Sequence, residues 1–504
     1  MSMPAERIRT SKTLGELLQG IAEAPAIDIA GIASDSRLLE RGFLFLACAG
    51  ESSHGLDYLD KAISAGVAAV AFDADTASEP SADVGVPMIA VPGLAKQLGV
   101  IANRYYDFPS EHMSVVGVTG TNGKTTVAWL IAQCWNLLGR KCAYVGTLGA
   151  GLDEISGGEG MTTPGAVELH GRLADFRDAG AEATAIEVSS HALAQNRVDG
   201  VTFDTVMFTN LSRDHLDYHG DMHSYAEAKA KLFVEHKAEH RIINLDSEFG
   251  VELASRCGQQ VVTVSTNFDR VANGRRYVFA RSVVAKNDGS LVRVSSSWGD
   301  GEFALPLPGD FNVANAVIVL ALLLRDGIDI DRACDLLSCV KAPPGRMQRV
   351  EAPDSLPTVY IDYAHSPTAI EVALRALRAH CKGKLWCVFG CGGDRDTGKR
   401  PLMAKAAERL ADRVVITNDN PRNEPPDDIF GQMLAGLTRP DAATVIEDRA
   451  AAIAWAIGEA GNEDIILIAG KGHEDYQLIG GERLDFSDIG AARANLDALA
   501  EARK

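Results

Sequence analysis

The chain has 504 residues. A chain of this length exceeds the size at which a single hydrophobic core keeps growing, so the length predicts two to four domains. Hydrophobic residues make up 46% of the chain and charged residues 23%, which is the composition of an ordinary globular protein. The formal net charge of −19 argues against a general nucleic-acid binder, because such a protein presents a basic surface. It still leaves room for local Arg and Lys residues that hold an anionic small molecule.

Cysteine usage and hydrophobic runs indicate a reducing compartment. The nine cysteines include no CxxC pair, and an odd number in so long a chain is not a disulfide framework. Residues 1–18 are polar and lack the apolar segment of a signal peptide, and no run of about 18 apolar residues occurs anywhere. We therefore expect a cytoplasmic enzyme without a membrane segment.

Two seams divide the sequence into three blocks. The first seam lies at Arg104–Ser114, and the second, at Val340–Gln348, contains two prolines and a glycine that stop a helix. The predicted domains are therefore 1–112, 113–342 and 343–504. Apolar strand-like runs alternate with helical patterns in the second and third blocks, which is typical of parallel sheets covered by helices. The predicted fold class is α/β with mostly parallel sheets.

The stretch SVVGVTGTNGKTTVAWLIAQ (residues 114–133) predicts a strand, a glycine turn and a helix. The turn, Gly120-Thr121-Asn122-Gly123, lets backbone N–H groups point at phosphate oxygens, which the following helix N-terminus also attracts. We expect Lys124 to reach the β- and γ-phosphates of a nucleotide and the Thr125 hydroxyl to bind Mg²⁺. The eight-residue Walker A pattern fails at one position, where Val118 replaces its first glycine.

Further candidate ligands follow other apolar runs of the second block. Glu187 ends one run and His215 follows another, and both are hard or borderline ligands suited to Mg²⁺ or Mn²⁺ beside Thr125. The spacing of His215 and His219 also suits zinc, but no third ligand follows at a recognised spacing, so we disfavour zinc. The pair Thr162-Thr163 precedes Pro164 at the expected start of a helix that suits a phosphate.

In the third block, each of four strand-like runs is followed by a polar loop. These loops are residues 361–367, 390–401, 417–425 and 469–477. Since the carboxyl ends of parallel strands meet at one edge of a sheet, the four loops can converge on one ligand. One glycine-rich loop is weak support for a site, whereas four loops that carry Gly, Arg, Lys and His are stronger.

The third of these loops, TNDNPRNEP, is a rigid turn. Pro421 fixes its own φ and pushes Asn420 toward an extended conformation, so the turn presents Asp419 and Arg422 in a fixed arrangement. A surface turn whose arginine caps a neighbouring helix is the alternative, and it would be favoured if the motif stood alone.

Taken together, the motifs resemble those of the Mur ligases of bacterial cell-wall synthesis. In chain order they are TGTNGKTT, EVSSHAL, NLSRDHLDYH, PGDFNVANA, YAHSP, GCGGDRDTGKRP, DNPR and AGKGHE, and they span most of the chain. The early run SDSR…GFLFLACAG is similar to the UDP-binding start of this family. The resemblance implies a smaller N-terminal α/β domain that binds UDP, a central P-loop ATPase and a C-terminal Rossmann-like domain that binds an amino acid.

The resemblance also implies ATP-dependent amide formation. The γ-carboxylate of D-glutamate in UDP-MurNAc-L-Ala-D-Glu takes the γ-phosphate of ATP, and the amine of an amino acid then displaces phosphate from the acyl phosphate. The motifs are most similar to those of members that add meso-2,6-diaminopimelate. The expected partners are these small molecules, with neither nucleic acid nor membrane, and we expect a monomer.

The implied cofactor is Mg²⁺, because a carboxylate and a triphosphate must be brought together against their repulsion. The resemblance places Thr125, Glu187 and His215 around the metal. It matches Lys229 to a lysine that becomes N6-carboxylysine, a carbamate that helps to hold a second Mg²⁺. Without the resemblance, Lys229 would be interpreted as a solvated helix lysine like Lys231.

The same matching gives the remaining expected roles. The catalytic residues are Lys124, Glu187, His215 and Lys229. The contacts of the UDP-muramoyl-dipeptide are Ser34, Ser36, Glu51, Ser52, Ser53, Thr162, Thr163, Ser189, Gln195 and Arg197. The contacts of ATP are Gly120, Thr121, Asn122, Gly123, Lys124, Thr125, Thr126, Asn315, Arg346, Asp362 and His365. The contacts of diaminopimelate are Arg395, Asp419, Asn420, Pro421, Arg422, Gly470 and Glu474.

Three alternatives remain. A lysine-adding Mur ligase lacks the arginine of the turn, and lysine would leave Arg422 without its anion at a cost of about 1–3 kcal/mol. Folylpolyglutamate synthetase shares the glycine loop but is not expected to have this turn together with AGKGHE. A regulatory P-loop ATPase would leave the loops of the third block without a purpose. Two positions depart from the family pattern, with Met161 where some members carry Asn and Thr368 where Asp is frequent.

Overall fold

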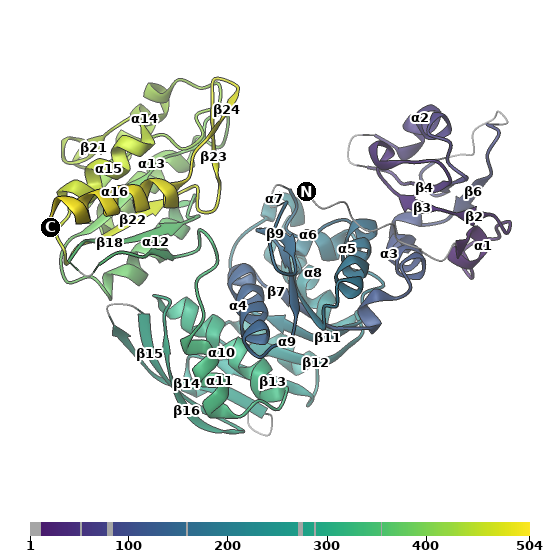
Figure 1. Cartoon of the computed structure of the whole chain (residues 1–504), viewed down its shortest axis with the longest axis horizontal. Coiled ribbons are helices and arrows are strands. Elements are labelled where there is room, and N and C mark those ends of the chain that lie inside the picture. The colour runs from purple at the N-terminus through teal and green to yellow at the C-terminus, as the bar shows by residue number, and fades with distance from the viewer. Residues whose placement is uncertain are drawn as a thin grey trace. The chain divides into compact units, whose positions relative to one another are not determined.

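The structure is a computed structural model that describes residues 12–50, 53–77, 84–157, 160–270, 276–286, 289–353 and 355–503 (Figure 1). The chain divides into two compact units. The first unit comprises the described residues up to Lys124, together with Trp135–Ile243 and Ser247–Val261. The second unit comprises Thr125–Cys134, Asn244–Asp246 and the described residues from Val262 onward.

The first unit begins with a four-stranded parallel sheet in the order β3-β4-β5-β6. Apolar side chains of β4 and β5 alternate between two cores, and one of these cores is completed by α3. The elements of this part are β1 (Lys12–Thr13), α1 (Leu14–Leu17), β2 (Asp28–Ile29), β3 (Gly31–Ala33), β4 (Phe43–Ala47), α2 (Leu59–Ser64), β5 (Ala69–Asp73), β6 (Met88–Val91) and α3 (Leu94–Tyr105).

The rest of the first unit is a second sheet, in which β12, β11, β7, β10, β8 and β9 lie in that order. All neighbouring strands are parallel except β8 and β9, so the loops after β7, β10 and β11 open on the same edge. The elements are β7 (Ser114–Thr119), β8 (Cys142–Gly146), β9 (Gly149–Gly151), α5 (Ala166–Asp178), β10 (Ala183–Glu187), α6 (Ser190–Ala194), β11 (Phe203–Phe208), α7 (Leu216–His219), α8 (Met222–Val234), β12 (Ala238–Asn244) and α9 (Glu248–Arg256). Helix α4 (Lys124–Leu137) follows the loop after β7.

The second unit begins with β13 (Val261–Ser265), β14 (Arg276–Lys286), β15 (Gly289–Ser296) and β16 (Gly299–Leu305), which pair in chain order. Helices α10 (Asp310–Arg325) and α11 (Ile330–Ser338) follow them. Helix α10 is almost entirely buried, because its sequence is apolar on every face from Val313 to Leu324.

The C-terminal part of the second unit is a six-stranded sheet in the order β17-β18-β22-β19-β20-β21, parallel except for the edge pair β17 and β18. One core packs α12, α13 and α14 on one face, and a second core packs α15 and α16 on the other (Figure 1). The elements are β17 (Gln348–Val350), β18 (Thr358–Asp362), α12 (Pro367–Arg378), β19 (Leu385–Phe389), α13 (Lys399–Leu410), β20 (Arg413–Ile416), α14 (Pro426–Leu434), β21 (Thr444–Val445), α15 (Arg449–Glu459), β22 (Ile465–Ala469), β23 (Tyr476–Ile479), β24 (Glu482–Asp485) and α16 (Asp488–Ala502).

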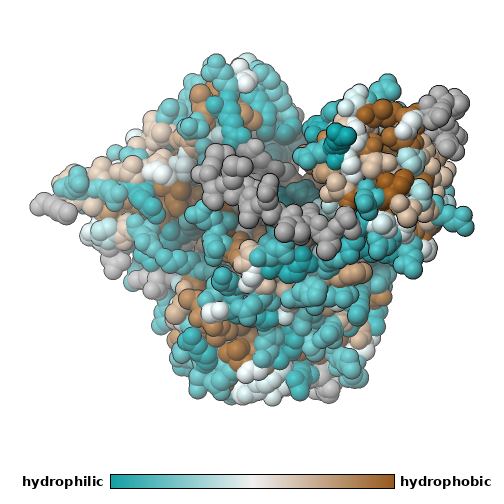
Figure 2. Space-filling model, turned by 45° about the vertical axis from the view of Figure 1, so that its right-hand side comes forward, coloured by the Kyte–Doolittle hydropathy of each residue, from teal (hydrophilic) through white to brown (hydrophobic). Residues whose placement is uncertain are grey.

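The α/β fold class with mostly parallel sheets is confirmed, and the four strands predicted in the third block are β18, β19, β20 and β22. All nine cysteines are free. In the described ranges, no helix combines the length and the hydrophobicity that crossing a bilayer requires. Figure 2 shows a face on which hydrophilic side chains predominate and hydrophobic ones gather in several patches. The domain boundaries at 112 and 342 stay a prediction.

Candidate active site

The glycine loop after β7 is held by the loop after β11. The Thr121 N–H donates to the Asn210 carbonyl oxygen at 2.8 Å, and the Asn122 N–H donates to Asn210 Oδ1 at 3.0 Å. The Thr209 hydroxyl donates to the Asn122 carbonyl oxygen at 2.6 Å. Gly120 has a φ of +149°, and a Cβ there would overlap the Thr209 hydroxyl, so only glycine fits. The loop therefore has one fixed shape.

Lys124, at the first position of α4, folds back onto this loop. Its Nζ donates to the carbonyl oxygens of Gly120 at 3.0 Å and Thr121 at 2.9 Å. The next two residues, Thr125 and Thr126, are buried in the first turn of the helix. A cation and a helix N-terminus at the end of a glycine loop form an arrangement that suits phosphate.

Glu187, the last residue of β10, is fully buried. Its Oε1 accepts hydrogen bonds from the Tyr144 hydroxyl and from the Thr147 N–H at 2.9 Å. Its Oε2 accepts from the Thr147 hydroxyl at 3.3 Å. These donors are all neutral. A buried carboxylate offers hard oxygen atoms of the kind that a divalent cation prefers.

Lys229 lies on the buried face of α8, not in solvent as its sequence context alone suggested. Its side chain is 1% exposed, and its Nζ donates to the Gly120 carbonyl oxygen at 2.8 Å. The Nζ also lies 4.5 Å from the centre of the Tyr225 ring. Burial, followed by the charge of Lys124, lowers the pKa of Lys229 well below its usual value. The spacing with Tyr225 and Leu232, four residues before and three after, was the sequence signal for this buried face.

A group of aromatic rings lies beside Lys229. The rings of His191 and His215 are 4.9 Å apart, and the ring of His215 is 6.0 Å from that of Tyr225. Burial, followed by His215, lowers the pKa of His191, and burial followed by His191 lowers the pKa of His219. His219 Nε2 is within 3.0 Å of the Ser190 hydroxyl. His215, in contrast, is about half exposed at 46%.

The residues expected to hold the muramoyl-dipeptide meet at the edge next to Glu187. The Thr163 hydroxyl donates to the Glu187 carbonyl oxygen at 2.7 Å and accepts from the Ser189 N–H at 3.0 Å. Arg197 donates from Nη1 to the Thr163 carbonyl oxygen at 3.0 Å and from Nε to Gln195 Oε1 at 2.9 Å. Thr163 is fully buried and ties these segments together. Thr162, its neighbour, is only partly buried, and its hydroxyl oxygen lies 3.2 Å from that of Thr147.

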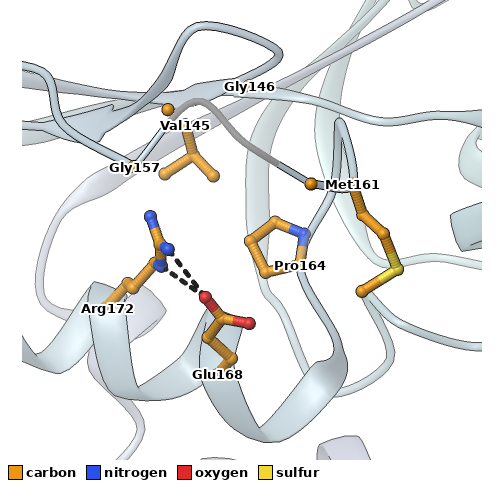
Figure 3. Close-up of a pocket in the computed structure, with 9 residues that line it drawn as sticks. Val145, Gly146, Gly157, Met161, Pro164, Glu168 and Arg172 are labelled. Carbon is orange, nitrogen blue, oxygen red and sulfur yellow. Dashed lines mark hydrogen bonds and ion pairs between the residues drawn. The ribbon is translucent and has the colours of Figure 1, made fainter. Parts of the chain in front are cut away.

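A cavity of about 200 Å³ lies beside this group. Figure 3 shows Val145, Met161 and Pro164 around it and the ion pair of Glu168 and Arg172 on α5 at its edge. The Arg172 Nη2 and Glu168 Oε1 atoms are 2.7 Å apart. Met161, which replaces the Asn of some family members, is 54% exposed.

The predicted UDP contacts lie at the carboxyl end of the parallel sheet of β3 to β6. Ser34 is exposed immediately after β3, and Ser36 begins a short 3₁₀ turn that ends at Leu38. Ser53 is exposed, and its hydroxyl lies 3.4 Å from that of Tyr58. Glu51 and Ser52 lie outside the described residues.

In the second unit, the predicted nucleotide contacts Arg346 and Asp362 lie near each other. The guanidinium of Arg346 lies 4.6 Å from the centre of the Tyr363 ring. Asp362, at the end of β18, accepts from the N–H groups of Met347 at 2.8 Å and Ala364 at 2.9 Å, while loss of hydration raises its pKa. His365 is exposed in the same loop. Asn315 lies elsewhere, buried in α10.

The four loops of the C-terminal sheet do meet at one edge. Arg422, with a φ of +54°, donates from Nη1 to the Gly393 carbonyl oxygen at 2.8 Å, which joins the loops after β20 and β19. Asn420 Nδ2 donates to Glu474 Oε2 at 3.0 Å, which joins the loops after β20 and β22. Gly470 has a φ of +118°, and a Cβ there would meet the Asp419 carboxylate. Arg395 is exposed in the loop after β19.

Two buried arginines that the sequence analysis did not single out support these loops. Arg449 is fully buried, pairs with Asp488, and donates to the carbonyl oxygens of Asn418 at 3.1 Å and Ala469 at 2.9 Å. Arg400 pairs with Glu424 at 2.6 Å and donates to the Gly392 carbonyl oxygen at 3.0 Å. The Arg400 hydrogen bond lowers the pKa of Glu424 to about 2. Arg400 lies in the motif GCGGDRDTGKRP, but its partner Glu424 is distant in the chain, and Arg449 lies in none of the motifs.

Comparison with known families identifies three consecutive segments. The profile of the Mur ligase family catalytic domain matches residues 28–106, that of the Mur ligase middle domain residues 118–323, and that of the Mur ligase glutamate ligase domain residues 345–472. Together they cover well over half of the chain.

Curated relatives match over nearly their full length. The chain is 43% identical over 465 residues to UDP-N-acetylmuramoyl-L-alanyl-D-glutamate–2,6-diaminopimelate ligase of Haemophilus influenzae, covering 92% of this chain and 95% of the relative. The proteins of the same name are 45% identical in Pseudomonas putida, with 92% and 94% covered, and 44% identical in Xylella fastidiosa, with 98% and 99% covered.

Comparison with solved structures shows the same similarity. A structure of a ligase of the same name superposes with a TM-score of 0.71 at 32% identity, covering 97% of this chain and 99% of that one. The folylpolyglutamate synthase of Mycobacterium tuberculosis superposes with a TM-score of 0.58 at 20% identity, covering 80% and 95%, so it shares the fold.

Proposed function

The chain belongs to the Mur ligase family, and we propose that it joins meso-2,6-diaminopimelate to the γ-carboxylate of D-glutamate in UDP-MurNAc-L-Ala-D-Glu, with hydrolysis of ATP to ADP and phosphate. In the first step the substrate carboxylate attacks the γ-phosphate and ADP leaves. In the second, the amine attacks the acyl carbon, a tetrahedral intermediate collapses, and phosphate leaves. The product is one new amide in the peptide of the cell-wall precursor.

The first unit supplies the phosphate chemistry. The glycine loop leads into the N-terminus of α4, whose positive dipole end attracts the triphosphate, and Lys124 would exchange its bonds to loop carbonyls for bonds to the β- and γ-phosphates. The carboxylate to be phosphorylated would bind near Thr162, Ser189 and Arg197, next to this loop. Arg197 is the cation of that group, which suits it to hold a carboxylate of the dipeptide.

The donor set of this region fits Mg²⁺. Glu187 is a buried carboxylate that would offer hard oxygens, the Thr125 hydroxyl and a carbamate on Lys229 would add further ones, and His215 would be a borderline ligand. The bound ion would offset the repulsion between the triphosphate and the substrate carboxylate.

The modification of Lys229 is supported by its environment. Burial lowers its pKa, which favours the neutral amine, the form that adds CO₂. In that addition the nitrogen forms a bond to the carbon of CO₂ and releases one proton. The neutral amine thereby becomes an anion. That change places negative charge beside Lys124, where a buried ammonium is disfavoured.

The observation that carries the choice of amino acid is that Arg422 and Glu474 both contact Asn420 at one sheet edge. The distal centre of meso-diaminopimelate bears a carboxylate and an ammonium. Arg422 suits the first and Glu474 the second. Asp419 is buried and packs against Gly470, whereas Glu474 is partly exposed, so Glu474 is better placed for the ammonium.

The assignment is tested by phosphate release from ATP with UDP-MurNAc-L-Ala-D-Glu and a panel of amino acids, together with product mass. We expect release only when both substrates are present, and fastest turnover with meso-diaminopimelate. Equal turnover with L-lysine would point to the lysine-adding reaction, and release that ignores both substrates would refute the ligase assignment.

Three further assignments follow from the same reaction. We propose a cytoplasmic location, where ATP and UDP-linked sugars occur, and a monomer as the active form. We also propose that residues 1–112 bind UDP, 113–342 bind ATP and 343–504 bind the amino acid. Cell fractionation and light scattering test the first two, and nucleotide binding by the separate segments tests the third.

A further inference from the structure

Lys471 is a fully buried lysine at the carboxyl end of β22, and it closes a ring of hydrogen bonds. Its Nζ donates to Asn420 Oδ1 at 3.1 Å and to Glu474 Oε2 at 2.9 Å. Asn420 Nδ2 in turn donates to the same Glu474 oxygen at 3.0 Å. Each member of the ring therefore contacts both others.

The backbone fixes the orientation of this ring. The Leu478 N–H donates to Asn420 Oδ1 at 3.0 Å, so this atom is the acceptor oxygen and the Asn420 NH₂ group must face Glu474. The Glu474 N–H donates to the Lys471 carbonyl oxygen at 3.0 Å, which keeps these two residues on one turn. Only a cation or a strong donor at position 471 satisfies both oxygens that face it.

Charge balance explains why the cation is a lysine inside the protein. A buried ammonium is stable only with a counter-charge, and the carboxylate of Glu474 supplies it. The pair leaves Glu474 with one engaged oxygen. In the described part of the chain, no hydrogen bond uses Glu474 Oε1.

The ring is also continuous with the arginine of the turn. The Arg422 N–H donates to the Leu478 carbonyl oxygen at 2.9 Å, and the Gly480 N–H donates to the Arg422 carbonyl oxygen at 2.7 Å. The strand β23 that orients Asn420 therefore also holds the backbone of Arg422. A shift of Asn420 or Glu474 would therefore disturb both ends of the amino-acid site, at Arg422 and at Glu474.

We propose that Lys471 is a positioning residue for selection of the third amino acid, one that holds Asn420 and Glu474 so that Glu474 Oε1 receives the distal ammonium of diaminopimelate. The inference rests on the proposed function. Lys471 has no exposed surface, so it acts through Glu474, both directly and by way of Asn420, and does not contact the substrate.

The test compares Lys471→Met with Lys405→Met, which removes an exposed lysine from α13 of the same unit. Loss of one hydrogen bond to a charged group predicts a KM for diaminopimelate that rises roughly 10- to 100-fold in Lys471→Met. The KM values for ATP and for the UDP-dipeptide should stay within about twofold of those of the control. An unchanged KM for diaminopimelate overturns the proposal, and so does an equal rise in all three KM values.

A double-mutant cycle keeps the proposal testable if Lys471→Met folds poorly. The double variant Lys471→Met/Glu474→Gln removes both charges and so avoids an unpaired buried carboxylate. If Lys471 acts through Glu474, the KM for diaminopimelate of the double variant equals that of Glu474→Gln alone, whereas a further rise overturns the proposal. The wild-type protein tests the proposed function separately from the role of Lys471. If the wild type does not use diaminopimelate, the proposed function itself is refuted.

Discussion

The Nζ atom of Lys229 lies 2.8 Å from the carbonyl oxygen of Gly120, so a buried lysine of α8 donates a hydrogen bond to the glycine loop. A lysine buried in this way is unusual, because a buried ammonium is poorly hydrated. Its pKa is lowered, mainly by burial and then by Lys124. The contact places the residue where a carbamate would face the nucleotide.

We expect activity to depend on CO₂ through Lys229. Phosphate release in CO₂-depleted buffer should fall and should return when bicarbonate is added, because only the carbamate supplies the extra oxygen ligands. With ¹³C-bicarbonate, the wild type should show a carbamate signal by NMR that Lys229→Met lacks. The matched control is Lys231→Met on the same helix, which should keep both the signal and the activity. Full activity without CO₂, and no carbamate signal, would contradict the assignment.

Lys124→Met should abolish turnover. Its ammonium is held over the glycine loop by two carbonyl oxygens, at 3.0 Å from Gly120 and 2.9 Å from Thr121, and its loss leaves the β/γ-phosphate charge without this partner. The expected fall in kcat is at least about 100-fold, as for removal of one preorganised electrostatic donor. Single-turnover phosphate release measures it, and a wild-type kcat would refute the loop assignment.

The sequence predicted those structural features whose pattern lies in neighbouring residues. The strand, glycine turn and helix from Ser114 onward follow from neighbouring residues, and so does the turn that ends in Arg422. The convergence of four loops followed from the rule for parallel strands. The buried pair of Arg449 and Asp488 did not, because its members lie on two helices and meet only after the sheet forms.

Arg422→Ala should raise the KM for diaminopimelate far more than the KM for ATP. The guanidinium is partly buried and has one short bond, to the Gly393 carbonyl oxygen, which leaves other N–H groups for a carboxylate. Loss of a charged hydrogen bond predicts a roughly 10- to 100-fold rise in KM for the amino acid. Steady-state kinetics with each substrate varied in turn measures the split, and equal effects on both would count against this site.

Breaking the pair of Arg449 and Asp488 should destabilise the second unit strongly. Both side chains are 0% exposed, so Arg449→Met leaves a buried carboxylate without its partner, at a cost of about 3–5 kcal/mol. The matched control is Arg378→Met, whose pair with Asp412 is 42% and 46% exposed and should contribute only about 0–1 kcal/mol. Urea unfolding measures both, and similar midpoints for the two variants would contradict the expectation.

His170 should make the first unit less stable in weak acid. Its ring is fully buried in α5, its Nε2 lies 2.9 Å from the Asp199 carbonyl oxygen, and burial lowers its pKa to about 4. The carbonyl oxygen can only accept, so Nε2 carries the proton of the neutral ring. In the unfolded chain, the pKa of His170 is near 6.5. Between about pH 6.5 and pH 4, His170 is therefore protonated in the unfolded chain but neutral in the folded protein. Stability from this group is therefore complete above about pH 6.5 and is lost as the pH falls.

The variant His170→Gln isolates this effect, because glutamine can also donate to a carbonyl oxygen but does not titrate. Between pH 7.5 and pH 5, the wild type should lose about 2 kcal/mol more free energy of unfolding than the variant does. Urea unfolding at several pH values gives this difference directly, and carboxylates that titrate in the same range cancel because both proteins share them. Parallel pH profiles for the two proteins would show that His170 is protonated equally in the folded and unfolded states.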